Sequence, residues 1–450
     1  MRFIGDIALD AEVRAIASGA ITDGEPVIVN STGTVSGVTD ATAQTLGSEV
    51  VFESAATKYP AVTFDSNSNR VVIAYMDEGN SNYGTAIVGT ISGTSVSYGT
   101  AVVFESAQAN WVNATFDSSN NKIVITYQDA GNSSYGTAIV GTVDSSDNSI
   151  SYGSPTVFNS ATTSQGKITF DSSNNKVVIA YNNGGDSGHG YAIVGTVSGT
   201  SISFGSAAEF ENAVISDPAI TFDSSNNKVV IVYRDEGNSN YGTAIVGTVS
   251  STSISFGSAS VYHAVNASET AMTFDSSNNK VVVAYTSGGD SDHGYAVVGT
   301  VSSTSISFGT SVEFRNADQR YNAIAFDSSV NKVVISFRED DDSGKGKLVV
   351  GTVSGTGISF GDPVEFNGGS TTFTNSTFDS FNNRVIITYK DGGNSGYGTS
   401  IIFANAGTPE DLTIGQQYFV QTNGSLGTSA DDPSVIAGTA IGTSDLIVKG

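Results

Sequence analysis

The chain has 450 residues, of which 38% are hydrophobic, with 51 glycines and no cysteine. Its net charge of −25 would repel phosphate backbones, so nucleic acid is not an expected partner. Without cysteine there is no disulfide and no thiolate metal or redox chemistry, and no run of about 18 apolar residues predicts a membrane span.

The first 45 residues differ in pattern from the body of the chain. Asp6, Asp10, Glu12 and Arg14 interrupt the apolar residues at the N-terminus, which leaves no secretory hydrophobic stretch, so we expect synthesis and assembly in a cytoplasm. Residues 24–38, GEPVIVNSTGTVSGV, predict a strand, a polar turn with glycine and a second strand.

A unit of about 52 residues then repeats, and its marker is a Phe-Asp pair. Each unit resembles AITFDSSNNKVVIVYRDEGNSNYGTAIVGTVSSTSISFGS, in which β-branched and aromatic runs alternate with Gly, Asn and Ser clusters. This pattern predicts four strands per unit, here called A (AITFD), B (KVVIVYRD), C (YGTAIVGTV) and D (ISFGSASVY). The pairs begin at Phe64, Phe116, Phe170, Phe222, Phe274, Phe326 and Phe378.

Strands B and C are apolar at consecutive positions, so both of their faces need cover. Stacked four-stranded blades supply that cover, and the period and strand number are typical of a β-propeller. The last unit, residues 378–404, lacks a strand D, whereas an orphan strand D, SEVVFES, stands at residues 48–54. Pairing the orphan with the last strand C removes two unpaired edges. We therefore predict an all-β fold with a seven-bladed β-propeller of four-stranded blades over residues 46–406, closed by N-terminal strand pairing in the last blade.

The segments between strands D and A differ in every unit, while most other turns are nearly uniform. Four antiparallel strands place the D–A and B–C connections on one face and both chain ends on the other. The variable face is thus the predicted binding surface, although unconstrained drift of the copies would give the same variety. Aromatic and arginine side chains are typical anchors for partners. The candidate binding residues are Lys58, Tyr59, Trp111, Arg234, Arg320, Tyr321, Arg338, Phe373 and Lys390.

Residues 407–450 leave the repeat again. Residues 415–429, GQQYFVQTNGSLGTS, weakly resemble residues 24–38 and predict the same strand–turn–strand arrangement. Because closure of the propeller would bring both tails to one face, we expect residues 1–45 and 407–450 to fold together as a small β-domain that mounts the propeller.

The tail segments AITDGEPVIVNSTGTVSGV and IGQQYFVQTNGSLGT…AGTAIGTSDLIVKG are similar to terminal stretches of bacteriophage virion proteins, especially from marine phages. This resemblance implies a virion structural protein of the tail-fibre, receptor-binding or capsid-surface type, present in several copies. It implies that the terminal module contacts other virion proteins and that the propeller faces a host-surface glycan or protein. A purely structural capsid decoration or tail adaptor is the alternative.

A second alternative is a sialidase-like glycoside hydrolase, because the motif D-x-G-N-S-x-Y-G resembles the Asp-box of those enzymes. Their site needs three clustered arginines, and the eight arginines of this chain are dispersed over tails, turns and distant units, so we expect no catalysis. His189 and His293 occupy matching positions two units apart, and we predict no metal site for them. No cofactor is expected, although the acidic loops at residues 77–80 and 339–342 leave Ca²⁺ open.

Overall fold

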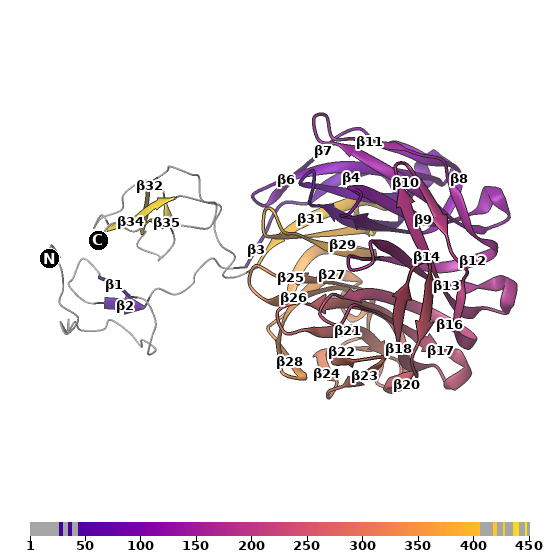
Figure 1. Ribbon diagram of the computed structural model, residues 1–450. Helices are drawn as coiled ribbons and strands as arrows, with labels where there is room; N and C mark the ends of the chain where they lie inside the picture. Colours follow the sequence, from indigo (N-terminus) through magenta and orange to yellow (C-terminus); the bar gives the residue numbers. More distant parts are fainter. Residues whose placement is uncertain are drawn as a thin grey trace. The chain divides into compact units, whose positions relative to one another are not determined.

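The computed structural model describes residues 44–405 in full and, outside them, the backbone of six short strands. These are β1 (Val27–Val29), β2 (Val35–Gly37), β32 (Gln417–Val420), β33 (Leu426–Gly427), β34 (Val435–Ala440) and β35 (Leu446–Ile447). The chain divides into two compact units, Leu46–Ala404 and Met1–Thr45 with Asn405–Gly450 (Figure 1).

The tail strands pair as the two strand–turn–strand patterns predict. Strand β1 pairs with β2, and β32 pairs with β33, β34 joining on its other side and β35 pairing with β34. The other residues on which the mounting-module prediction rests lie outside the described residues. In the described part of the chain, no helix is long and apolar enough to cross a membrane.

The larger unit consists of antiparallel strands in one recurring arrangement, illustrated by its fourth repeat. The second half of β16 (Ala208–Asp223) pairs with β17 (Lys228–Asp235), which pairs with β18 (Tyr241–Ser250). Strand β18 pairs in turn with β19 (Ser253–Phe256) and with the first half of β20 (Ser260–Asp275). Strands B and C thus form as predicted. Strand D differs: it is divided into two pieces, and in this repeat its second piece continues into the next strand A, so that the variable D–A segment is extended strand.

The remaining strands of the unit follow the same order. They are β3 (Thr45–Leu46), β4 (Val50–Asp65), β5 (Arg70–Asp77), β6 (Tyr83–Ser92), β7 (Ser95–Tyr98), β8 (Val102–Asp117), β9 (Lys122–Asp129), β10 (Tyr135–Asp144), β11 (Ser149–Tyr152), β12 (Thr156–Asp171), β13 (Lys176–Asn183), β14 (His189–Ser198), β15 (Ser201–Phe204), β21 (Lys280–Ser287), β22 (His293–Ser302), β23 (Ser305–Phe308), β24 (Val312–Arg315), β25 (Gln319–Asp327), β26 (Lys332–Glu339), β27 (Lys345–Ser354), β28 (Gly357–Phe360), β29 (Val364–Asp379), β30 (Arg384–Asp391) and β31 (Tyr397–Ala404).

Short 3-10 helices connect strands B and C. They are η1 (Glu78–Asn80), η2 (Ala130–Asn132), η3 (Gly184–Asp186), η4 (Glu236–Asn238), η5 (Asp340–Asp342) and η6 (Gly392–Asn394). Before η1, the carboxylate of Asp77 accepts hydrogen bonds from the amides of Gly79 and Asn80 at 2.9 and 3.1 Å. Asp65 of the Phe-Asp pair binds the two amides of its A–B turn in the same way. Asp77 and Asp65 therefore serve first as caps for backbone amides, whereas Glu339 before η5 makes no such cap.

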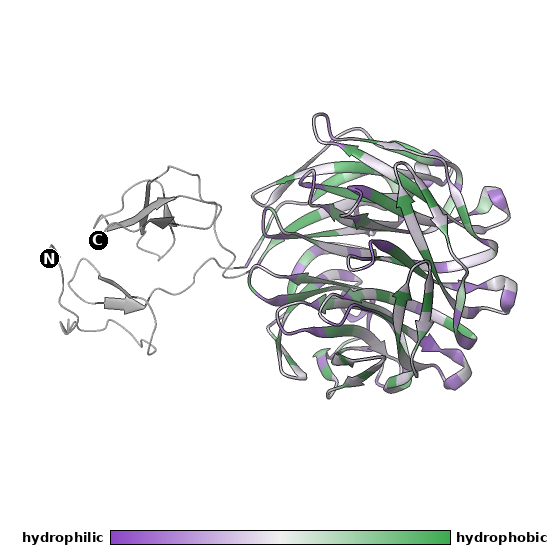
Figure 2. Ribbon diagram, in the orientation of Figure 1, coloured by the Kyte–Doolittle hydropathy of each residue, from purple (hydrophilic) through white to green (hydrophobic). Residues whose placement is uncertain are grey.

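The core lies between the repeats. Residues Val229 to Tyr233 of β17 are fully buried, as expected for a strand covered on both faces. The hydrophobic clusters each combine side chains of neighbouring repeats, so that Val230 and Val246 pack with Val281 and Val297. Figure 2 shows hydrophobic residues along the strands and hydrophilic residues at the loops.

The first and last repeats are joined by the pairing that the sequence predicts. Strand β31 pairs antiparallel with β4, placing Ser400 opposite Val50 and Gly398 opposite Glu53. The indigo β4 and the yellow-orange β31 accordingly lie near one another in Figure 1. The long inner strands contact each other in a cycle, from β4 through β8, β12, β16, β20, β25 and β29 back to β4.

This closing pair predicts a sensitive glycine. A Cβ atom at Gly398 would meet the ring of Phe52 well inside van der Waals distance, whereas a Cβ atom at Gly361 would meet nothing within 4 Å. We expect Gly398→Ala to lower the free energy of unfolding by about 1–3 kcal/mol, the usual cost of overpacking, and Gly361→Ala to leave it nearly unchanged. Urea unfolding followed by fluorescence measures both, and equal stability of the two variants would contradict the packing described.

Candidate binding site

Each repeat has a bulge in its long inner strand, five residues before the Phe of the Phe-Asp pair. In the fourth repeat the pairing of β16 with β17 shifts between Ser216 and Ala219, leaving Asp217 and Pro218 unpaired. The first residue of each bulge has a positive φ of 48° to 56°, a region that aromatic side chains rarely adopt. A bulge of this kind re-aims the side chain. The seven residues are Tyr59, Trp111, Gln165, Asp217, Glu269, Tyr321 and Phe373.

All seven re-aimed side chains line a single cavity of about 260 Å³. Each repeat therefore contributes one position to the same site, and the chemistry of the site is set by what each repeat places there. The volume lies just below the usual range of small-molecule pockets, so it suits a ligand of roughly one sugar ring in size.

Four aromatic rings form one side of the cavity. Tyr321 packs on Phe373 with ring centroids 5.3 Å apart, and Phe373 packs on Tyr59 at 5.1 Å. Tyr59 packs on Trp111 at 4.9 Å. These residues come from the sixth, seventh, first and second repeats, so the wall is continuous only because β31 pairs with β4.

The opposite side is polar and links successive repeats. The backbone amide of Asp217 donates to the side-chain oxygen of Gln165 at 2.9 Å. The amide of Tyr321 donates in the same way to the carboxylate of Glu269 at 3.2 Å. Lys167, two residues after Gln165, also lines the cavity. An amide, two carboxyl groups and an ammonium group thus face the aromatic wall.

Burial shifts the ionisation of these polar groups. It raises the pKa of Glu269 from 4.5 to about 7, with the negative charge of Asp217 adding to the effect and Arg320 and Lys167 opposing it. Burial also raises the pKa of Asp217 and lowers the pKa of Lys167. The cavity therefore holds one carboxyl group whose charge changes near neutral pH, beside two groups whose pKa values burial shifts, and shifted pKa values are common at functional sites.

A second cavity of about 220 Å³ shares Lys167, Asn113, Asn322 and Asn375 with the first. Its lining residues follow the bulges along the inner strands and include Ala219 and other alanines. Small side chains at these positions leave the space that forms this second cavity next to the first.

The structure separates the predicted binding residues into two groups. Tyr59, Trp111, Tyr321 and Phe373 meet in the cavity, as described above. The five predicted cations do not line it, and each forms an ion pair with acidic side chains instead. Lys58 and Lys390 bind the two oxygens of Glu78, Arg234 binds Glu236, and Arg320 and Arg338 bind Asp340.

Gln165, Asp217 and Glu269 were absent from the predicted set. Their residue types are common on any exposed loop, and strand A was expected to begin only after them. Their common spacing of five residues before the Phe-Asp pair, shared with the four aromatic residues, was the signal that could have found them.

No known protein family and no curated protein matches the sequence. Solved structures do match. BP39L lectin from Burkholderia pseudomallei superposes with a TM-score of 0.56 at 11% identity, over 79% of this chain and 99% of that one. The β-propeller domain of Cps50 (Swd1) from Myceliophteria thermophila gives 0.52 at 8% identity, over 80% and 99%. The chain has a β-propeller fold. A chain in the mitotic checkpoint complex matches this propeller with a TM-score of 0.52 at 10% identity, over 80% and 94%.

The raised pKa of Glu269 predicts a pH-dependent stability. Between about pH 4.5 and 7 the folded propeller holds a proton on Glu269 that the unfolded chain releases, so stability falls as pH rises through this window. Glu269→Gln keeps an acceptor for the amide of Tyr321, as Gln165 does for Asp217, and removes the titration. We expect the variant to gain stability relative to the parent between pH 5 and pH 8 in urea unfolding. Parallel pH profiles would show that Glu269 titrates normally.

Proposed function

We propose that the propeller binds a glycan in the bulge-lined cavity without altering it chemically. The observation that supports this is the division of the cavity into an aromatic half and a polar half. A sugar ring has an apolar C–H face that packs on aromatic rings and a rim of hydroxyl groups that hydrogen-bond to amides and carboxylates. The fold is compatible with this role, since a lectin from Burkholderia pseudomallei shares it.

The proposal includes seven four-stranded blades arranged around this cavity. Each blade would consist of the second half of one long strand, strands B and C, and the first half of the next long strand. In the register of β31 with β4, Ser400 lies opposite Val50 and Tyr397 opposite Ala56, so Ala404 ends β31 at the end of the strands remote from Tyr59. The tails would then leave the propeller on the side opposite the cavity.

We further propose that this chain is a component of a phage virion, assembled in the host cytoplasm and displayed in several copies. The resemblance of both tail segments to virion proteins supports this. In this arrangement the tails contact other virion proteins and the cavity faces a glycan of the host surface. A capsid decoration or tail adaptor remains the alternative, and it would leave the cavity without a host ligand.

Binding without catalysis fits the cavity better than hydrolysis. Within the described part of the chain, the cavity lining contains no arginine to hold a substrate carboxylate. Tyr321 lies beside Glu269, a pair that could suggest a tyrosine nucleophile. However, burial and the nearby carboxyl group of Glu269 raise the pKa of Tyr321, which disfavours the phenolate that such a mechanism needs.

Removal of one aromatic ring tests the glycan proposal. Trp111→Gln places at this bulge the residue that the third repeat carries there, so the backbone is accommodated. We expect the dissociation constant for a host-surface oligosaccharide, identified on a glycan array, to rise about tenfold, or about 1.4 kcal/mol. Isothermal titration measures the change.

Phe381→Gln is the matched control, because Phe381 is an aromatic residue of an A–B turn with 58% of its surface exposed. It should bind as the parent does. Equal loss in both variants, or no array signal that depends on Trp111, would contradict a glycan site in the cavity. Release of reducing sugar from host polysaccharide would instead support the hydrolase.

The virion proposal has its own test. An antibody against the propeller should label intact particles of the phage that encodes the chain, and purified propeller should compete with the particles for host cells. Labelled particles without competition would favour the structural adaptor. Unlabelled particles would contradict the virion assignment while leaving the glycan site untouched.

A further inference from the structure

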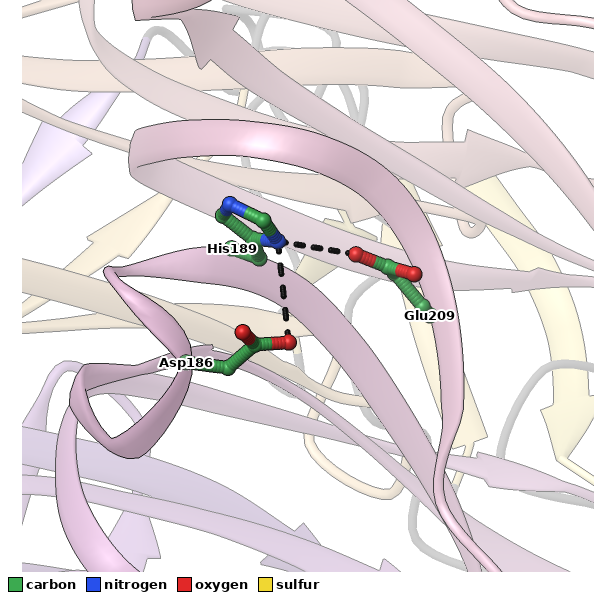
Figure 3. Close-up of side chains that lie close together, drawn as sticks. All are labelled: Asp186, His189 and Glu209. Atoms are coloured by element: carbon green, nitrogen blue, oxygen red, sulfur yellow. Dashed lines mark hydrogen bonds and ion pairs between the residues drawn. The ribbon is translucent and has the colours of Figure 1, made fainter.

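Two identical side-chain clusters lie outside the cavity, in the third and fifth repeats. In the third repeat, Nδ1 of His189 lies 2.9 Å from Oε1 of Glu209 and 3.6 Å from Oδ2 of Asp186 (Figure 3). The three residues come from the start of β14, the outer part of β16 and the end of η3. The fifth repeat places His293, Glu313 and Asp290 in the same way, at 2.8 and 3.8 Å.

The other repeats show that these three positions change together. In the first, second, fourth and seventh repeats the same positions carry Asn, Tyr and Val, as in Asn80, Tyr83 and Val103. The acidic pair therefore appears only where a basic residue stands between its members. On a surface where acidic residues are merely solvated, the three positions would not have to change together. We therefore treat the three residues as one unit.

The sixth repeat supplies the strongest clue to what the unit holds. There Lys345 replaces the histidine, and its ammonium group lies 3.4 Å from Asp342 and 3.1 Å from Glu365. A fixed positive charge thus sits between the two carboxylates in that copy. In the histidine copies an imidazole takes the place of this ammonium group between the two carboxylates, and a bound cation would supply positive charge there.

We propose that Asp186, His189 and Glu209, and likewise Asp290, His293 and Glu313, are two independent sites for a divalent metal ion of the Zn²⁺ type. The ligand atoms of each cluster lie within 4.8 Å of one another. A tetrahedral ion with ligand distances near 2.1 Å needs its ligand atoms about 3.4 Å apart. In each cluster, one carboxylate oxygen lies closer to the histidine Nδ1 than this and the other lies farther away. One imidazole nitrogen and two carboxylate oxygens leave the fourth position to water.

The surroundings already hold one ligand in place. The hydroxyl group of Tyr191 donates to Asp186 Oδ2 at 2.6 Å, and Tyr295 donates to Asp290 in the fifth repeat. Hydrogen bonds of this kind orient metal-bound carboxylates. The first, second, fourth and seventh repeats carry threonine in place of this tyrosine, and the sixth carries Lys347. Ca²⁺ prefers six to eight oxygen ligands, so a site with one nitrogen and two carboxylates selects against it.

This inference departs from the expectation that His189 and His293 hold no metal. They share none, since they stand two repeats apart, but each has its own pair of carboxylates. None of the six residues lines the bulge cavity, so the metal sites are separate from the proposed glycan site.

Metal stoichiometry tests the proposal on the full chain. After equilibrium dialysis against ZnCl₂, we expect two Zn²⁺ per chain, one for His189→Tyr and none for His189→Tyr combined with His293→Tyr. Tyrosine is the residue that four repeats carry at this position, so folding is preserved, and circular dichroism checks it. Conversion of the sixth repeat by Lys345→His with Lys347→Tyr should raise the count to three.

His263→Asn is the matched control, because His263 contacts Ser287 and Tyr285 rather than carboxylates, and Asn159 fills its position in the second repeat. It should retain two ions, and CaCl₂ in excess should displace neither. The proposal is overturned if the double tyrosine variant binds as much Zn²⁺ as the parent, or if the parent binds none above buffer.

Discussion

The pairing of β4 with β31 is the contact on which the rest of the structure depends. The start of β4, which precedes the first repeat, covers the open edge of the last repeat. The ring of Phe52 packs against Gly398 where the two strands meet. Its register repeats the pairing of strand C with the following long strand in the other repeats. Its effect is geometric, because it brings Tyr59 beside Phe373 and so joins the two ends of the aromatic wall.

The bulges explain how a repetitive sequence forms a site without symmetry. The backbone geometry is the same in every repeat, whereas the residue at the first bulge position is free to vary. Where it is polar, as in Gln165 and Glu269, its side chain accepts a hydrogen bond from the bulge of the next repeat. Where it is aromatic, it packs on the ring of its neighbour. Both kinds of contact are compatible with the same backbone, so the residues that line the cavity can differ while the fold is retained.

The sequence was sufficient for the parts of the structure that follow from strand patterning. The Phe-Asp period, the apolar runs of strands B and C and the orphan strand D predicted the strand pairs, because burial on two faces and unpaired edges leave few alternatives. The bulges were not predictable in this way. A positive φ at Trp111 or Phe373 goes against the backbone preference of aromatic residues, and it is imposed by the strand pairing before and after the bulge. For the same reason Asp217 and Glu269 looked like ordinary loop residues.

The variable cations lie outside the cavity for a related physical reason. The chain has a net charge of −25, so carboxylates are available to form ion pairs with its lysine and arginine side chains. Lys58 and Lys390 form such pairs with Glu78. Those two hydrogen bonds outweigh the effect of burial and lower the pKa of Glu78, so the carboxylate stays charged and keeps both cations paired. Variation among the repeats thus falls in two places, at the bulge positions that line the shared cavity and at the charged residues that pair with one another on the surrounding strands.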